Sequence, residues 1–266
     1  MKYFYNGILN NNPPFDKEDF GFFETMRVFK GNPVFMDDHI QRCNIALKYF
    51  GIENKEINFE KIILEHINVF YNLLKSDYIR FRIQFNFDRI DSSIFIWSQG
   101  EPFNKNICLN NKLYINCNYY YKRGDEINEY RDFKNKSRGI YSSVKKHAEM
   151  EGRFDSILVD SEKNISDTSI CNVFAIKGDV IYTPNLHLGG LKGILRKNLL
   201  LFLRKSNLNV VETNISDNDL LMADEVFLTN VIRGILPVNQ IEERKFEIHN
   251  WTYKIQHLFR KYQDSF

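Results

Sequence analysis

The stretch from Lys134 to Arg196 decides the fold, and it reads KNKSRGIYSSVKKHAEMEGRFDSILVDSEKNISDTSICNVFAIKGDVIYTPNLHLGGLKGILR. Apolar residues four positions apart, Ile140, Val144 and Ala148, predict a helix that stops at Gly152. Short apolar runs then predict strands over 156–160, 172–176 and 180–182. The loop from Gly189 to Gly193 opens another helix, running to about Lys205. A helix, several short strands and a second helix are typical of an α+β domain.

The same stretch contains three groups that could take part in chemistry. Lys134 supplies an amine, Asp167 supplies a carboxylate in a turn-rich segment, and the glycine loop presents backbone amides at a helix start. Each also has an ordinary explanation, as a surface lysine, a turn-forming aspartate and a simple glycine turn. Together they match the needs of pyridoxal 5′-phosphate (PLP): an imine-forming amine, a partner for the ring nitrogen and a phosphate site.

The remainder of the chain predicts two parts. A strand over 21–28, a helix from Asp37 or Asp38 to Phe50 and a helix over 57–74 come first. The run YIRFRIQFNF at 78–87 alternates apolar and polar residues, which predicts a strand with one buried face. We therefore expect a domain over 1–105, a polar linker over 106–112 and a strand-rich domain over 113–266 that ends in a helix at 247–261.

Composition excludes several classes of protein. Among 266 residues, 43% are hydrophobic and the net charge is +2, so we expect a folded chain that binds neither nucleic acid nor a membrane surface. The four cysteines show neither a C-x-x-C pair nor zinc-ligand spacing, which favours free thiols and no metal site. The first residues have no signal-peptide pattern, and we expect a cytoplasmic protein.

Three arginines are candidate anion ligands. Arg42 lies on the polar side of its predicted helix, where it is either a solvated residue or a bidentate phosphate ligand. Arg80 and Arg82 share the polar face of the alternating strand. That face is either solvated or a surface that binds the carboxylate of an amino-acid or keto-acid substrate.

Across nearly its whole length the chain resembles the fold-type IV PLP enzymes, which include branched-chain and D-amino-acid aminotransferases and aminodeoxychorismate lyase. The resemblance is carried by four ordered segments: GFFETMRVFKGNPVFMDDHIQR, ILVDSEKNISDTSICNVFAIKGDVIYTPNL, LKGILR and DEVFLTNVIRGILPV. It implies a two-domain α+β fold, with a small N-terminal α/β sandwich and a larger, strand-rich, barrel-like C-terminal domain. It also implies a homodimer.

Position by position, the resemblance makes Lys134 the imine-forming lysine, because its distance to Gly152 matches the family without a gap. Lys136 is the competing choice and requires a two-residue deletion. Asp167 stands where the family usually has Glu and is the partner of the ring nitrogen. The implied phosphate ligands are Arg42, the loop and helix start at Gly193, Ile194 and Leu195, and the pair Asn230 and Val231.

The chain departs from the family on the substrate side. The segment before Gly21, FDKEDF, is shortened relative to the family pattern. Glu24 takes a position where some lyase members have a hydroxyl residue, and a threonine there has been assigned a catalytic role. We therefore list Glu24 and Arg82 as candidate substrate ligands, and Glu24 as a feature that weighs against the lyase reaction.

Three functions follow from these observations. The first is a PLP-dependent class IV aminotransferase that transfers an amino group between an amino acid and a 2-keto acid. The alternative is an aminodeoxychorismate lyase, which converts 4-amino-4-deoxychorismate to p-aminobenzoate and pyruvate and fits the compact length. The third is a binding protein on the same fold that has lost the cofactor, which retention of the lysine, the acid and the arginine argues against.

Overall fold

A computed structural model describes residues 1–14, 20–52, 56–88, 93–103, 115–121, 132–135, 139–247 and 249–263. The chain forms two compact units. Unit 1 comprises Met1–Lys105 and Asp132–Arg138, and unit 2 comprises Asn106–Arg131 and Gly139–Phe266. Unit 1 is therefore built from two separate segments of the chain.

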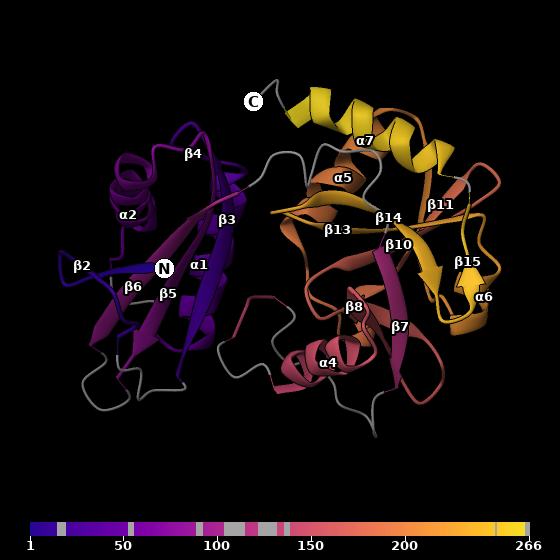
Figure 1. Ribbon diagram of the computed structural model, residues 1–266, viewed down its shortest axis with the longest axis horizontal. Helices are drawn as coiled ribbons and strands as arrows, with labels where there is room; N and C mark the ends of the chain where they lie inside the picture. Colours follow the sequence, from indigo (N-terminus) through magenta and orange to yellow (C-terminus); the bar gives the residue numbers. More distant parts are fainter. Residues whose placement is uncertain are drawn as a thin grey trace. The chain divides into compact units, whose positions relative to one another are not determined.

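Unit 1 contains an antiparallel sheet of order β2-β1-β6-β5-β3-β4 (Figure 1). Its strands are β1 (Lys2–Tyr5), β2 (Ile8–Asn10), β3 (Gly21–Phe29), β4 (Asn32–Pro33), β5 (Tyr78–Phe87) and β6 (Ile94–Pro102). Its helices are α1 (Met36–Tyr49) and α2 (Phe59–Leu74). The alternating run at 78–87 is thus the central strand β5, paired with β6 on one side and β3 on the other.

The core of unit 1 lies between this sheet and its two helices. Phe22 of β3 stacks on Phe85 of β5, and Phe59 of α2 meets both rings edge-on. Gly100 of β6 permits close approach by α2, because a Cβ there would lie 2.7 Å from the Phe70 ring. The helices therefore cover one face of the sheet, and the residues of β3 and β5 alternate between that face and the opposite one.

Unit 2 contains a larger sheet of order β12-β11-β10-β13-β14-β7-β8-β9, with β15 paired to β14. The strands are β7 (Ile115–Tyr121), β8 (Asp155–Val159), β9 (Ile165–Thr168), β10 (Asn172–Lys177), β11 (Val180–Pro184), β12 (Asn209–Thr213), β13 (Glu225–Asn230), β14 (Gly234–Ile241) and β15 (Arg244–Lys245). The helices are α4 (Gly139–Met150), η1 (Leu186–Leu188), α5 (Ile194–Lys205), α6 (Asp217–Leu221) and α7 (Asn250–Gln263).

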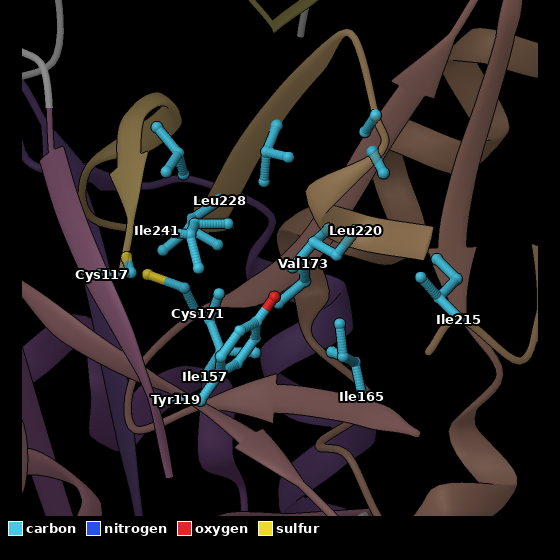
Figure 2. Close-up of a cluster of buried hydrophobic side chains, with 14 of the residues drawn as sticks. Cys117, Tyr119, Ile157, Ile165, Cys171, Val173, Ile215, Leu220, Leu228 and Ile241 are labelled. Carbon is cyan, nitrogen blue, oxygen red and sulfur yellow. The ribbon is translucent and has the colours of Figure 1, made fainter. Parts of the chain in front are cut away.

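The core of unit 2 lies on one face of this sheet. Figure 2 shows inward side chains of β7, β8, β10, β13 and β14, including Tyr119, Ile157, Val173 and Leu228, gathered around Cys171. Helices α5 and α7 contact one another and pack on β13 (Figure 1). Strand β9, at one end of the strand order, also contacts β11 near the other end. The sheet thus curls back on itself, which gives the unit a barrel-like form.

The mixed sheets and helices confirm the predicted α+β class. The structure corrects one local prediction, because Asp167 lies in strand β9 and not in a turn. Pairing with β8 imposes that strand on a short, polar sequence. The predicted domain limits stay predictions, and the linker at 106–112 lies outside the described residues. Within the described ranges, no helix is long and apolar enough to cross a membrane, and no cluster of side chains is arranged to hold a metal ion.

Candidate functional site

A buried ionic cluster joins β3 to α1 in unit 1. The side chain of Glu24 is 0% exposed, and its carboxylate accepts hydrogen bonds from Nε and Nη2 of Arg42 at 2.6 and 2.5 Å. Nδ1 of His39 lies 2.7 Å from Oε2 of the same carboxylate. His39 and Arg42 are three positions apart on α1, so both face the strand. We call Glu24, His39 and Arg42 the buried triad.

The triad has a defined charge state. Burial alone would raise the pKa of Glu24, but the charge of Arg42 and hydrogen bonds from His39 and Arg42 hold it well below its usual range. Burial lowers the pKa of His39 despite the opposing effect of Glu24, so the imidazole is neutral at pH 7. An ionised carboxylate at Nδ1 requires Nδ1 to carry the proton. Nε2 of His39 is then an acceptor, and it has no hydrogen-bond partner among the described residues.

The triad changes the interpretation of two residues, Arg42 and Glu24. Arg42 was predicted on the polar side of its helix, yet it is only 5% exposed, because Glu24 supplies a buried partner. Glu24, the candidate substrate ligand, has both carboxylate oxygens engaged inside unit 1. These contacts make Glu24 a partner of Arg42 inside unit 1.

Lys134 also lies against β3. Its carbonyl accepts a hydrogen bond from the backbone N–H of Phe23 at 3.0 Å, and Asn135 forms an isolated bridge with Phe22. Nζ of Lys134 stands 5.7 Å from the centre of the Phe23 ring, and its charge contributes to lowering the pKa of His39. The half-buried amine of Lys134 is therefore near both the triad and Phe23. The competing choice, Lys136, lies outside the described residues.

The face of β3 away from the helices carries Phe23 and Thr25. Arg82 of β5 stacks on the Phe23 ring, with 4.0 Å between its guanidinium carbon and the ring centre, and Nη2 donates to Gln84 at 3.2 Å. Thr25 is buried and lies directly opposite Arg82 in the strand pairing. Arg80, two residues before Arg82 on the same strand, instead forms an ion pair with Glu101, with 2.6 Å between Nη1 and Oε1. Arg82 and a buried hydroxyl thus share the face on which the Lys134 amine meets Phe23.

In unit 2, Asp167 is held in one orientation. The residue is 3% exposed, and Oδ2 accepts hydrogen bonds from the Tyr141 hydroxyl at 3.1 Å and from the Leu191 N–H at 2.9 Å. Tyr141 comes from α4 and Leu191 from the glycine loop. The loop approaches β9 closely, because a Cβ at Gly190 would stand 3.1 Å from the carbonyl oxygen of Ser166. Asp167 and the loop predicted to bind an anion are therefore brought together.

The glycine loop leads into helix α5, whose N-terminus has no side-chain cap. Gly193 is the N-cap of α5, so backbone amides of the first turn, including those of Ile194 and Leu195, are available to an anion. Glycine is required there, since a Cβ would stand 2.0 Å from Oδ1 of Asn172. Nδ2 of Asn172 in turn donates to the Leu191 carbonyl at 2.8 Å, which fixes the loop.

A hydroxyl lies beside this helix start. Thr229 pairs directly with Asn172 across β13 and β10, so the two side chains share one face of the sheet. Oγ1 of Thr229 is buried and has no hydrogen-bond partner within the described ranges. The side chain of Asn230 is occupied elsewhere, because it donates to Sγ of Cys171 and accepts from the Arg233 N–H. Contact of Asn230 and Val231 with a phosphate therefore stays a prediction.

A buried carboxylate supports the turn between Asp167 and Asn172. Asp155 of β8 accepts hydrogen bonds from Oγ of Ser169 at 2.6 Å, Oγ1 of Thr168 at 2.6 Å and the N–H of Ile170 at 3.3 Å. The Ser156 and Ser169 amides also donate to it. The turn between Asp167 and Asn172, which sets the distance between these two residues, therefore depends on the side chain of Asp155.

The predicted residues fall into two groups. Glu24, Arg42, Arg82 and Lys134 gather around β3 in unit 1, while Asp167 joins Gly193, Ile194 and Leu195 at the start of α5 in unit 2. The sequence analysis assigned no role to His39, Tyr141, Thr229 or Asp155. The H-x-x-R spacing could have indicated His39, and strand alternation beside Asn230 could have indicated Thr229. The sequence contains no signal for Tyr141 or Asp155, because their partners are distant in the chain.

Known proteins match both the sequence and the fold. Residues 21–241 match the family model described as amino-transferase class IV. Aminodeoxychorismate lyase of Bacillus subtilis is 28% identical over 91% of this chain and 85% of its own length. A probable branched-chain-amino-acid aminotransferase of Thermotoga maritima is 33% identical over 35% of this chain and 34% of its own length. A hypothetical aminotransferase from Mycobacterium tuberculosis, in its PLP-bound form, superposes with a TM-score of 0.83, 14% identity and 98% coverage of each chain.

Proposed function

Because the chain belongs to the class IV aminotransferase family, whose members include aminodeoxychorismate lyases, we propose that it is a PLP-dependent enzyme with Lys134 as the imine-forming lysine. The family match covers the segments that carry Arg42, Lys134 and Asp167. The solved relative in its PLP-bound form has the same fold. The homodimer implied by the resemblance is part of this proposal, and light scattering of the purified protein tests it.

The observation that carries the proposal is the anion site at the start of α5. An uncapped helix, a glycine that permits close approach and a buried hydroxyl without a partner in the described chain are what a phosphate group requires. Asp167, oriented by Tyr141 and Leu191, supplies an acceptor for a protonated ring nitrogen. The residues present therefore fit PLP.

Bound PLP supplies an aldehyde that condenses with amines and a ring that stabilises negative charge at the adjoining carbon. The residues of this chain supply the rest. As the resemblance implies, the amides of Ile194 and Leu195 would hold the phosphate, Arg42 would be a further phosphate ligand, and Asp167 would keep the ring nitrogen protonated. Lys134 would hold a proton at Nζ and move it to or from the reacting substrate carbon.

For the reaction itself, we propose cleavage of 4-amino-4-deoxychorismate ahead of amino transfer, which reverses the order expected from the sequence. The lyase relative matches along 91% of this chain, whereas the aminotransferase relative matches along 35%. The residue that weighed against the lyase, Glu24, points to the helices and binds Arg42. Its neighbour Thr25 supplies a buried hydroxyl on the face with Phe23 and Arg82. This hydroxyl, one position after Glu24, supports the lyase proposal.

Two assays separate the candidate reactions. With 4-amino-4-deoxychorismate, the lyase releases p-aminobenzoate and pyruvate, and Thr25→Val should lower the rate of release while Thr25→Ser retains it. With glutamate or a branched-chain amino acid and a keto acid, an aminotransferase forms the new amino acid. Amino transfer without p-aminobenzoate release would establish the aminotransferase and reject the lyase.

The lysine and the cofactor have their own test. Purified protein reconstituted with PLP should absorb as a PLP imine, and borohydride reduction followed by peptide mass spectrometry should place the pyridoxyl group on Lys134. Modification of Lys136 would reverse the assignment. A protein that cannot be reconstituted with PLP would reject both reactions and favour the cofactor-less binding protein.

A further inference from the structure

The roles proposed above do not account for the geometry of the buried triad. A guanidinium has five N–H bonds on two edges that can each engage an oxyanion in bidentate fashion. Glu24 occupies the edge formed by Nε and Nη2 of Arg42. The edge formed by Nη1 and Nη2 is therefore the one left to face an anion, and its direction is set by the carboxylate behind it.

The carboxylate is itself fixed by a third residue. Oε2 of Glu24 is shared by Nη2 of Arg42 and Nδ1 of His39, at 2.5 and 2.7 Å. His39 approaches from the same helix as Arg42, one turn earlier, and its ring is 0% exposed. An acid bound from two sides cannot rotate about its last bond without losing one of these contacts. His39 therefore restricts Glu24, and Glu24 restricts Arg42.

We propose that Glu24 and His39 are positioning residues for the cofactor phosphate, which act by holding the outer edge of Arg42 toward it. This inference rests on the proposed function, in which Arg42 binds that phosphate. Neither residue touches the reacting atoms. Glu24 balances the arginine charge inside the unit, and His39 remains neutral so that the Nδ1 proton stays directed at the acid.

The proposal predicts an effect specific to the phosphate. PLP and pyridoxal form the same imine with a lysine, but only PLP carries the phosphate. Loss of the orienting carboxylate should therefore reduce the affinity for PLP and leave the affinity for pyridoxal nearly unchanged. A general loosening of unit 1 would weaken both ligands alike.

The experiment titrates the apoenzyme with PLP and with pyridoxal, follows the imine absorbance, and reports the ratio of the two affinities. In Glu24→Gln one acceptor oxygen becomes a donor facing a donor of Arg42, and the ratio should fall by about tenfold, the equivalent of roughly one oriented charge-assisted hydrogen bond. His39→Asn keeps a donor close to the position of Nδ1 and should retain the wild-type ratio. His39→Leu removes the donor and should lower the ratio.

His66 provides a matched control in the same unit. It lies on α2, and its Nδ1 is 2.7 Å from Oγ of Ser98. His66→Leu should leave the ratio unchanged. If Glu24→Gln fails to fold, the pair His39→Asn and His39→Leu decides the question. Equal ratios in wild type, Glu24→Gln and His39→Leu would overturn the inference, whereas a wild type that forms no imine with PLP would overturn the proposed function instead.

Discussion

Substitution of Asp155 by asparagine tests how strongly one carboxylate holds the turn beside Asp167. The side chain is fully buried and accepts five hydrogen bonds, three at Oδ1 and two at Oδ2. With the asparagine oxygen in place of Oδ1, the bonds from Ser156 and Ser169 persist but lose their ionic character. The amide NH2 then faces the Thr168 hydroxyl, which can instead donate to the Cys171 carbonyl, and the N–H of Ile170, whose bond to residue 155 is lost.

The cost follows from these contacts. Hydrogen bonds to a charged group contribute about 1.5–3 kcal/mol and neutral ones about 1 kcal/mol, so weakening three of them removes at least about 1.5 kcal/mol. Ile170 is 48% exposed and its N–H also lies 3.4 Å from Oγ1 of Thr168, so loss of its bond to Asp155 adds less than about 1 kcal/mol. We therefore expect Asp155→Asn to lower the free energy of unfolding of unit 2 by at least about 2 kcal/mol, a sizeable part of the total for a domain of this kind.

The two tryptophans allow unit 2 to be measured separately. Trp97 lies in β6 of unit 1 and Trp251 in α7 of unit 2, and the chain has 2 in total. In a Trp97→Phe background, urea unfolding followed by tryptophan fluorescence reports unit 2 alone. Asp224→Asn is the matched control, because its carboxylate is half-exposed and accepts from the Gly178 N–H at 2.7 Å. A loss for Asp155→Asn no larger than for Asp224→Asn would refute the reasoning.

Three further substitutions address the phosphate site, a helix start and the response to acid. Gly193→Ala should weaken PLP binding at least about tenfold in a spectroscopic titration, because the new Cβ would lie 2.0 Å from Oδ1 of Asn172 and must displace that side chain, and wild-type affinity would contradict the close approach. Glu225→Gln should lower the free energy of unfolding of unit 2 by about 1–2 kcal/mol in urea, because its carboxylate accepts three hydrogen bonds at the start of α7, two of them from Thr252. Burial lowers the pKa of His66 from 6.5 to about 4, so the unfolded chain binds more protons between these values and stability should fall with falling pH by at most about 1.4 kcal/mol per unit. His66→Gln should flatten that part of the profile of unfolding free energy against pH, and an unchanged slope would exclude His66 as its source.

Features with local causes could be predicted from the sequence. The alternation at 78–87 predicted β5 and its apolar buried face, although Gln84 and Asn86 of the polar face are buried as well, and the glycine loop with the following apolar run predicted the start of α5. Both signals lie within a dozen residues, where periodicity and turn chemistry act directly. The comparisons confirm the fold-type IV architecture that the ordered motifs implied.

Features that depend on distant partners could not be predicted. Arg42 reads as a surface residue of an amphipathic helix until Glu24, 18 positions earlier and on a strand, is known to face it. β9 is a short polar segment whose strand conformation is imposed by β8. Asp155 resembles any strand residue, although five donors converge on it from the turn at 168–170 and from its own neighbour. Long-range contacts of this kind leave no periodic pattern in the chain.

The two-segment construction of unit 1 has a consequence for the order in which the protein matures. Strand β3 is synthesised among the first thirty residues, yet the Phe23 amide and the Phe22 bridge find their partners only in Lys134 and Asn135. A nascent chain that ends near residue 105 contains all six strands of the sheet but lacks the partners of this edge. Closing it joins residues more than a hundred positions apart, which is an entropically costly and slow kind of contact. The proposed reactive amine, Lys134, lies in the second and last segment of unit 1. The growing polypeptide therefore has no complete imine site until half of the chain has been translated.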